Sequence, residues 1–142
     1  MRAMGLDVGT KTVGIAVADE LGFSAQPITT VRRTNIKADL AAIAQLINEY
    51  GVTHLIVGLA LNMNGSEGPR AEQCRKLGDA IAEYALLPVI YWDERLTSVA
   101  AEKSLIEADV SRAKRKQVVD QVAAVLILQG WLESQSPARD TE

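Results

Sequence analysis

The chain has 142 residues, of which 48% are hydrophobic and 23% charged, and its formal net charge is −3 at pH 7. This length suits one domain with a sizeable core, and the composition is that of a soluble globular protein. A protein that binds nucleic acid over its whole surface would usually be basic, so the charge argues against that class and leaves a local basic face open.

No feature of the sequence predicts export or membrane insertion. The N-terminus lacks a basic region followed by an apolar run and a small-residue cleavage site, so we expect no signal peptide. No apolar run approaches the ~20 residues that a membrane helix needs. Cys74 is the single cysteine, so there is neither an internal disulfide nor a zinc-binding cysteine spacing. We expect a cytoplasmic protein without a membrane partner.

The first elements predicted are a hairpin and an edge strand. Residues 3–8 form an apolar strand, residues 9–11 turn the chain, and large and small apolar residues alternate over 13–17. The short link makes these two strands an antiparallel hairpin. Pro27 precedes a third short strand, residues 28–32, which we expect at the edge of the sheet.

Helices and strands then alternate along the chain. A helical stripe of apolar residues runs from Ile36 to Ile47, with Asn35 as its cap and Gly51 at its end. We then predict a buried strand over residues 54–58, a helix over 69–85 that opens on Pro69, and a strand over 89–92. A helix capped by Thr97 follows, and a last helix covers residues 115–133.

The last helix and the tail complete the predicted domain. Val118, Val122 and Val125 share one face of that helix, with Val119 and Leu126 beside them. Residues 134–142 are polar, and we expect them to be disordered, which leaves residues 1–133 as a single domain. Hairpin strands followed by alternating helices and strands predict a mixed α/β sheet with helices on both faces, whose site lies at the carboxyl ends of strands.

Three acidic residues stand where an uncharged residue would serve the fold better. Asp7 interrupts the first strand, Glu94 directly follows the fifth, and Asp120 lies near the apolar stripe of the last helix. Hard divalent cations prefer carboxylate oxygens, and two such ions about 4 Å apart promote phosphodiester hydrolysis. Together the three acids indicate a metal site.

Each acid also has an ordinary structural interpretation. Asp7 can make the turn before Val8 and Gly9. Glu94 can be a solvated acid, a role that fits the neighbouring Asp93 better. Asp120 can pair with Lys116 one helical turn away, which contributes only ~0.3–0.5 kcal/mol when exposed.

Four sequence blocks resemble the YqgF family, also called RuvX, of the RNase H-like superfamily. They are "GLDVGTKTVGIAVAD" (5–19), "LIVGLALNMNGSEGPRA" (55–71), "WDERLTSVAAE" (92–102) and "KQVVDQVAAVLILQGWL" (116–132). They occur in order and span nearly the whole chain. The chain departs from the family at Ala60, where the family often has proline. This departure changes none of the three acidic residues.

The resemblance implies a fold and an activity. The implied fold is RNase H-like, a five-stranded mixed sheet in the order 3-2-1-4-5 with strand 2 antiparallel and helices on both faces. The implied activity is that of a divalent-metal nuclease using Mg²⁺ or Mn²⁺, and the proposed catalytic, metal-binding acids of the family fall on Asp7, Glu94 and Asp120. Asp7 would then lie on the central strand because that strand is a rigid mount for a metal ligand.

Other residues are candidates for contact with phosphate. Thr10 and Lys11 follow Asp7, a polar loop precedes the helix at Pro69, and a basic run precedes Asp120. The alternatives are a hairpin tip, an Asn/Gly turn and a solvated face. The candidates are Thr10, Lys11, Asn62, Asn64, Gly65, Ser66, Arg70, Arg95, Arg112, Lys114, Arg115 and Lys116, with Arg75 and Lys76 weaker. We expect His54, Cys74, Trp92 and Trp131 to be structural.

The hypothesis favoured by the resemblance is an endonuclease that trims the 5′ end of precursor 16S rRNA in ribosome biogenesis. Its partners would be RNA and ribosomal precursor particles, and the protein would be a monomer or a homodimer. The relationship to RuvC makes four-way DNA junctions the alternative substrate, and paired cuts in a junction would need a dimer. A non-catalytic nucleic-acid-binding module is a further alternative. A sugar-kinase-like or actin-like ATPase would need two such domains, and 142 residues supply one.

Overall fold

The computed structural model describes the backbone of residues 1–96 and 112–135. It describes the side chains of residues 1–95 and 121–135. Five strands form one sheet in the order β3-β2-β1-β4-β5. Strand β2 runs antiparallel to both its neighbours, whereas β1, β4 and β5 are parallel. The predicted order and direction of the strands are therefore confirmed. The described elements are β1 (Ala3–Val8), β2 (Thr12–Ala18), β3 (Ala25–Arg32), α1 (Ile36–Tyr50), β4 (His54–Leu59), α2 (Pro69–Ala85), β5 (Val89–Asp93), a 3₁₀ turn (Glu94–Leu96) and α4 (Arg112–Ser134).

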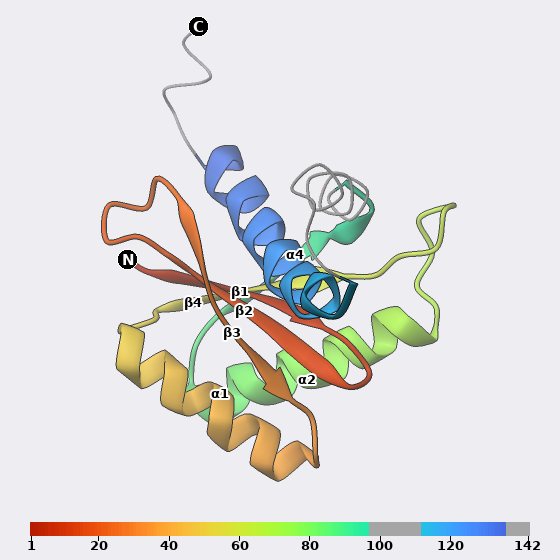
Figure 1. Cartoon of the computed structure of the whole chain (residues 1–142), viewed down its shortest axis with the longest axis horizontal. Coiled ribbons are helices and arrows are strands. Elements are labelled where there is room, and N and C mark those ends of the chain that lie inside the picture. Colours follow the sequence, from red (N-terminus) through yellow and green to blue (C-terminus); the bar gives the residue numbers. More distant parts are fainter. Residues whose placement is uncertain (97–111, 136–142) are drawn as a thin grey trace, which may run out of the picture.

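The helices cover the sheet from two sides. Helices α1 and α2 lie against one face and α4 crosses the other (Figure 1). Side chains alternate between the faces along each strand. On β1, Met4, Leu6 and Val8 belong to the core cluster beneath α1 and α2, whereas Ala3 belongs to the cluster beneath α4. Asp7 follows the same alternation and therefore faces α4.

Helix α4 packs closely because both surfaces in contact carry small residues. A Cβ atom on Gly5 would lie 2.8 Å from the carbonyl oxygen of Ala124, so only glycine allows the helix to come so near to β1. Val122 and Val125, which the sequence places on one apolar face of this helix, are half-buried, and Val125 packs against the edge of the α4 cluster. The buried face consists of Ala123, Ala124, Ile127, Leu128 and Trp131.

The first two helices begin and end as predicted. The Asn35 side chain accepts a hydrogen bond from the Ala38 amide, and Gly51 closes α1 with a φ of 63°. Pro69 occupies the first turn of α2, where the missing amide hydrogen has no helical partner to lose. The helix predicted from Thr97 lies outside the described residues, and α4 begins three residues before the predicted start.

Strand β3 differs from the prediction. It begins at Ala25 rather than at residue 28, and Pro27 lies within it opposite Ala16. The pairing shifts register between Ile15 and Ala16, which forms a bulge. Strand β3 pairs only with β2 and is therefore an edge strand, as predicted, where a proline is tolerated. Among the described residues, no helix has the length and hydropathy required to cross a membrane.

Candidate active site

Asp7 lies near the carboxyl end of the central strand. It pairs with Gly14 on β2, and the register Leu6–Val57 continues to place Gly58 of β4 on its other side. The two neighbours on the sheet therefore have no side chains that could cover the Asp7 carboxylate, which is half-buried. The strand holds the backbone of Asp7 rigidly, while the glycines leave space above the sheet on the α4 side.

Glu94 approaches the same space from the end of β5. A Cβ atom on Gly58 would lie 2.9 Å from Cγ and 3.1 Å from Cδ of Glu94 and would also collide with Ile127 of α4. The Glu94 side chain therefore crosses over β4 at Gly58, on the α4 side of the sheet. Because Gly58 is the neighbour of Asp7 in the register, the two carboxylates lie over adjacent strands.

The electrostatic surroundings of Cys74 agree with this placement. Burial raises the pKa of the Cys74 thiol, and the negative charges of Glu94 and Asp7 raise it further. Arg70 acts in the opposite direction on the same pKa. Cys74 is fully buried on α2, so it is a packing residue, as predicted, and its high pKa makes it a poor nucleophile.

Asp120 belongs to the part of α4 nearest to Asp7. Gln121 donates to the Thr30 hydroxyl and Gln129 accepts from the Ala25 amide, so α4 runs antiparallel to β3. Strand β3 is parallel to β1, and therefore the helix position one turn before Ala124 lies toward the carboxyl end of β1. That position is Asp120, whose side chain lies outside the described residues.

Two described carboxylates fit a hard divalent cation. Asp7 and Glu94 supply oxygen donors over adjacent strands, and Gly58 forms the bare floor that lets Glu94 reach the site. Within residues 1–96 and 121–135, no three His, Cys, Asp or Glu side chains are gathered for metal binding. A third carboxylate would have to come from elsewhere, and Asp120 is the predicted source.

Two arginines hold the backbone directly after Asp7. Arg70 of α2 donates to the Val8 carbonyl at 3.0 Å, and Arg33 donates to the Gly9 carbonyl at 3.0 Å. Arg70 was a predicted phosphate contact, whereas Arg33 was not singled out because no motif surrounds it. Both side chains restrain the end of the strand that carries Asp7.

Comparison with known sequences identifies the family. The family model of RuvX, described as Holliday junction resolvase, matches residues 1–134. The chain belongs to the RuvX family. A RuvX relative from Myxococcus xanthus is 61% identical over 137 residues, covering 96% of this chain and 91% of its own. One from Moorella thermoacetica is 57% identical over 133 residues, covering 94% and 95%. Both are named "Putative pre-16S rRNA nuclease".

Solved structures share the RuvX fold at low sequence identity. RuvC of T. thermophilus, in complex with Holliday junction substrate, has a TM-score of 0.59 and 15% identity, covering 94% of this chain and 97% of RuvC. The fowlpox virus Holliday junction resolvase has a TM-score of 0.55 and 15% identity, covering 96% and 100%. These similarities show that RuvX has the RuvC-type, RNase H-like fold.

The polar loop of this RuvX chain is closed by its own hydrogen bonds. The Asn62 amide donates to the Ser66 carbonyl, and the Asn62 side chain donates to the Ser66 hydroxyl. Asn64 accepts from both the amide and the hydroxyl of Ser66, and Gly65 has a φ of 86°. The loop is exposed and projects beyond the sheet (Figure 1). Contact of these four residues with phosphate stays a prediction.

Arg95 connects this loop with the end of β5. Its guanidinium pairs with Asp93 at 2.7 Å and donates to the Met63 carbonyl at 3.2 Å. The pairing with Arg95 lowers the pKa of Asp93. Arg95 follows Glu94 directly in the sequence, and Asp93 offsets part of its positive charge.

The remaining predicted residues fall in different environments. Thr10 and Lys11 are exposed at the β1–β2 turn. Arg75 forms an ion pair with Glu67 and lies 4.7 Å from the centre of the Tyr91 ring, a structural role. His54 contacts the Thr53 hydroxyl at the amino end of β4, away from the acids. The basic residues Arg112, Lys114, Arg115 and Lys116 belong to the first turns of α4, and their side chains lie outside the described residues.

Proposed function

We propose that the protein is a divalent-metal-dependent endonuclease that hydrolyses phosphodiester bonds in precursor 16S rRNA. The observation that carries the proposal is the passage of Glu94 over Gly58 toward Asp7, because it gathers two carboxylates that the fold does not require. Relatives named as pre-16S rRNA nucleases, 61% and 57% identical over nearly the whole chain, support this choice of substrate.

Asp7, Glu94 and Asp120 would hold Mg²⁺ or Mn²⁺. When bound, the cations supply Lewis acidity to the scissile phosphate and an activated water. Asp7 provides a donor fixed on the central strand, and Glu94 provides one that Gly58 admits. Arg70 and Arg33 keep the strand end from moving when substrate binds.

Contacts with the substrate backbone would come from basic residues at the same end of the sheet. The β1–β2 turn, the loop after β4 and the first turns of α4 all lie at this end (Figure 1). We include Thr10, Lys11, Arg70 and the four basic residues of α4 among the phosphate contacts. Because phosphate contacts release counterions, binding would weaken as salt rises.

The test is cleavage by the wild type and by Asp7→Asn. Labelled precursor rRNA, single-stranded RNA and a four-way DNA junction are each incubated with Mg²⁺, Mn²⁺ or chelator. We expect metal-dependent cutting of precursor rRNA by the wild type, and cutting at background level by Asp7→Asn with an unchanged circular dichroism spectrum. Full activity of a folded Asp7→Asn protein would overturn the proposed role of Asp7.

A junction resolvase is the second candidate, because the RuvX family is described by that activity. Preferential cutting of the four-way junction in the same assay would select it. If no substrate is cut while both proteins are folded and bind nucleic acid, the protein is a binding module instead.

A further inference from the structure

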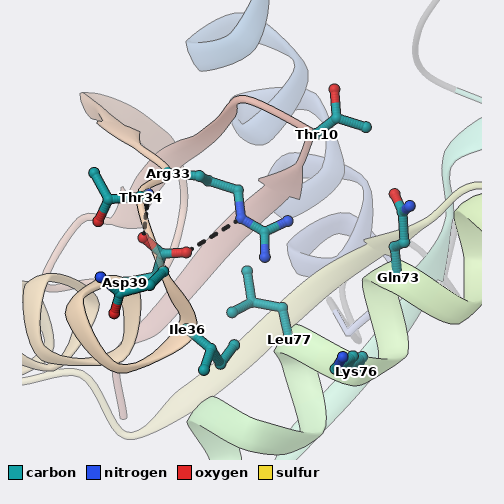
Figure 2. A pocket seen from close by; sticks show the side chains of 9 residues that line it. Thr10, Arg33, Thr34, Ile36, Asp39, Gln73, Lys76 and Leu77 are labelled. Carbon is teal, nitrogen blue, oxygen red and sulfur yellow. Dashed lines mark hydrogen bonds and ion pairs between the residues drawn. The ribbon is translucent and has the colours of Figure 1, made fainter.

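A polar cavity lies beside the turn that follows Asp7, on the side of α1 and α2. Its volume is about 340 Å³, and residues from three separate parts of the fold line it. Thr10 comes from the β1–β2 turn, Arg33 from the link between β3 and α1, and Gln73 and Lys76 from α2 (Figure 2). Asp7 faces α4, so this cavity is distinct from the space above the carboxylates.

A buried carboxylate orients Arg33 in this cavity. Asp39 is only 2% exposed, and among the described side chains no other charged residue is buried. One of its oxygens accepts from Nε of Arg33 at 3.3 Å, and the other accepts from the Thr34 amide at 3.0 Å. Both oxygens of Asp39 therefore accept a hydrogen bond, and Nη1 of Arg33 donates to the Gly9 carbonyl at 3.0 Å. Figure 2 shows the guanidinium extending away from Asp39 toward the middle of the cavity, which leaves Nη2 as its nitrogen without a hydrogen bond to the described residues. Burying an ion pair adds little to stability on average, so stability alone is a weak explanation for this arrangement.

The other wall adds positive charge and neutral donors. Lys76 is exposed on α2 and forms no ion pair with any residue of the described chain. The Thr10 hydroxyl and the Gln73 amide are uncharged groups that can donate hydrogen bonds. Since Asp39 offsets the charge of Arg33, Lys76 gives the lining a net positive charge. Nη2 of Arg33 and the Lys76 ammonium can both donate to the oxygens of a phosphate group, and their positive charge favours an anion over a neutral ligand.

We propose that this cavity, the Arg33 pocket, binds a backbone phosphate of the nucleic-acid strand at a position flanking the bond that is cleaved. The inference rests on the proposed nuclease function and adds a subsite to it. Thr10 is three residues beyond Asp7, a path of at most ~10 Å along extended chain. A strand advances about 3.4 Å per nucleotide in a duplex, so the pocket would lie two or three nucleotides from the phosphate at Asp7.

Lys76→Ala tests the subsite without disturbing the fold, because Lys76 makes no ion pair with described residues. Fluorescence anisotropy with single-stranded RNAs of 2, about 8 and about 16 nucleotides, in chelator, measures binding without cleavage. We expect Lys76→Ala to raise the Kd of the longer strands about threefold and to reduce the salt slope by about 0.7. The dinucleotide, which cannot span Asp7 and the pocket, should show no change.

Lys37→Ala is the matched control. Lys37 is an exposed lysine in the first turn of α1 and does not line the cavity. Its replacement should leave both the Kd and the salt slope unchanged. Equal effects of the two substitutions would mean that only general surface charge is measured, and no effect of Lys76→Ala at any length would exclude the subsite. Either result overturns the proposal.

A free phosphate is the other source of the same chemistry. The midpoint of thermal unfolding, measured with inorganic phosphate and with a mononucleotide, distinguishes a free phosphate ligand from a phosphate of a bound strand. Stabilisation by these ligands in the wild type but not in Lys76→Ala, with strand binding unchanged, would assign the pocket to a free ligand and overturn the strand subsite. Because all these readouts measure binding, they remain decisive even if the wild type cleaves none of the substrates.

Discussion

The two faces of the sheet are built from different residues. Toward α1 and α2 the strands present large side chains such as Met4, Leu6 and Leu55, all fully buried. Toward α4 the first three strands present small residues such as Ala3, Gly5 and Ala16, with Asp7 in the same row, whereas β4 and β5 add Ile56, Ile90 and Trp92. Burial of large apolar side chains contributes most of the stabilising free energy, so the first face supplies stability.

The second face gives up part of that contribution in exchange for space. Small residues allow α4 to approach the sheet, and at Gly58 the same absence of a side chain admits Glu94. The comparison teaches that glycine has two uses on one surface, helix packing at Gly5 and carboxylate placement at Gly58. Substitutions on the two faces should therefore affect different measurements.

The largest effect is expected for Gly58→Ala on the α4 side. The added Cβ would push Glu94 away from Asp7, and a misplacement of about 1 Å at a reacting centre reduces the rate about 100-fold. The rate of precursor rRNA cleavage per folded molecule measures this loss. Gly78→Ala is the control, because its Cβ would crowd Tyr91 on the opposite face. If both variants keep the wild-type rate, Gly58 has no special role in placing Glu94.

The second effect concerns stability and the α1 side. Ile43 is fully buried in the larger core cluster, and Ile43→Ala should lower the free energy of unfolding by about 2–5 kcal/mol. Urea unfolding measures the loss, and Ile43→Val should cost only about 0.5–1.5 kcal/mol. Activity corrected for the folded fraction should stay at the wild-type level. A specific loss of activity would contradict the division of labour between the faces.

The smallest effect is expected for a polar contact on the same side. The Tyr91 hydroxyl donates to Asp79 at 2.5 Å and lies 3.1 Å from the Arg75 carbonyl, and burial raises the pKa of Tyr91. Tyr91→Phe should lower the free energy of unfolding by about 0.5–1.5 kcal/mol, since water replaces part of the lost hydrogen bonding. A loss as large as that of Ile43→Ala in the same urea experiment would show that polar contacts rival apolar burial on this face.

Sequence reasoning succeeded where local rules decide the structure. Asn35, Gly51 and Pro69 mark helix ends by their own conformational preferences, and the structure agrees at all three. The strand order followed from the family resemblance and is confirmed. Asp7 and Glu94 were selected because a carboxylate beside an apolar strand is unusual; the structure places them over adjacent strands, and their role as metal ligands stays a prediction.

Sequence reasoning failed where packing between distant segments decides. Val118, Val122 and Val125 recur at helical spacing, so the sequence indicated one apolar face of α4 through them. The structure instead buries Ala123, Ala124, Ile127, Leu128 and Trp131, with Ala124 against Gly5, where a larger side chain would hold the helix away from the sheet. The Arg33 pocket was also missed, since its walls come from three elements and no stretch of sequence contains them together.

The buried thiol of Cys74 has a practical consequence for all the stability experiments. It is the single cysteine of the chain, it is fully buried on α2, and its pKa is raised. A thiol reagent therefore reacts slowly with the native protein and rapidly with chains that have opened. The molecule carries its own reporter of unfolding, one label per chain, which counts open molecules without any engineered probe.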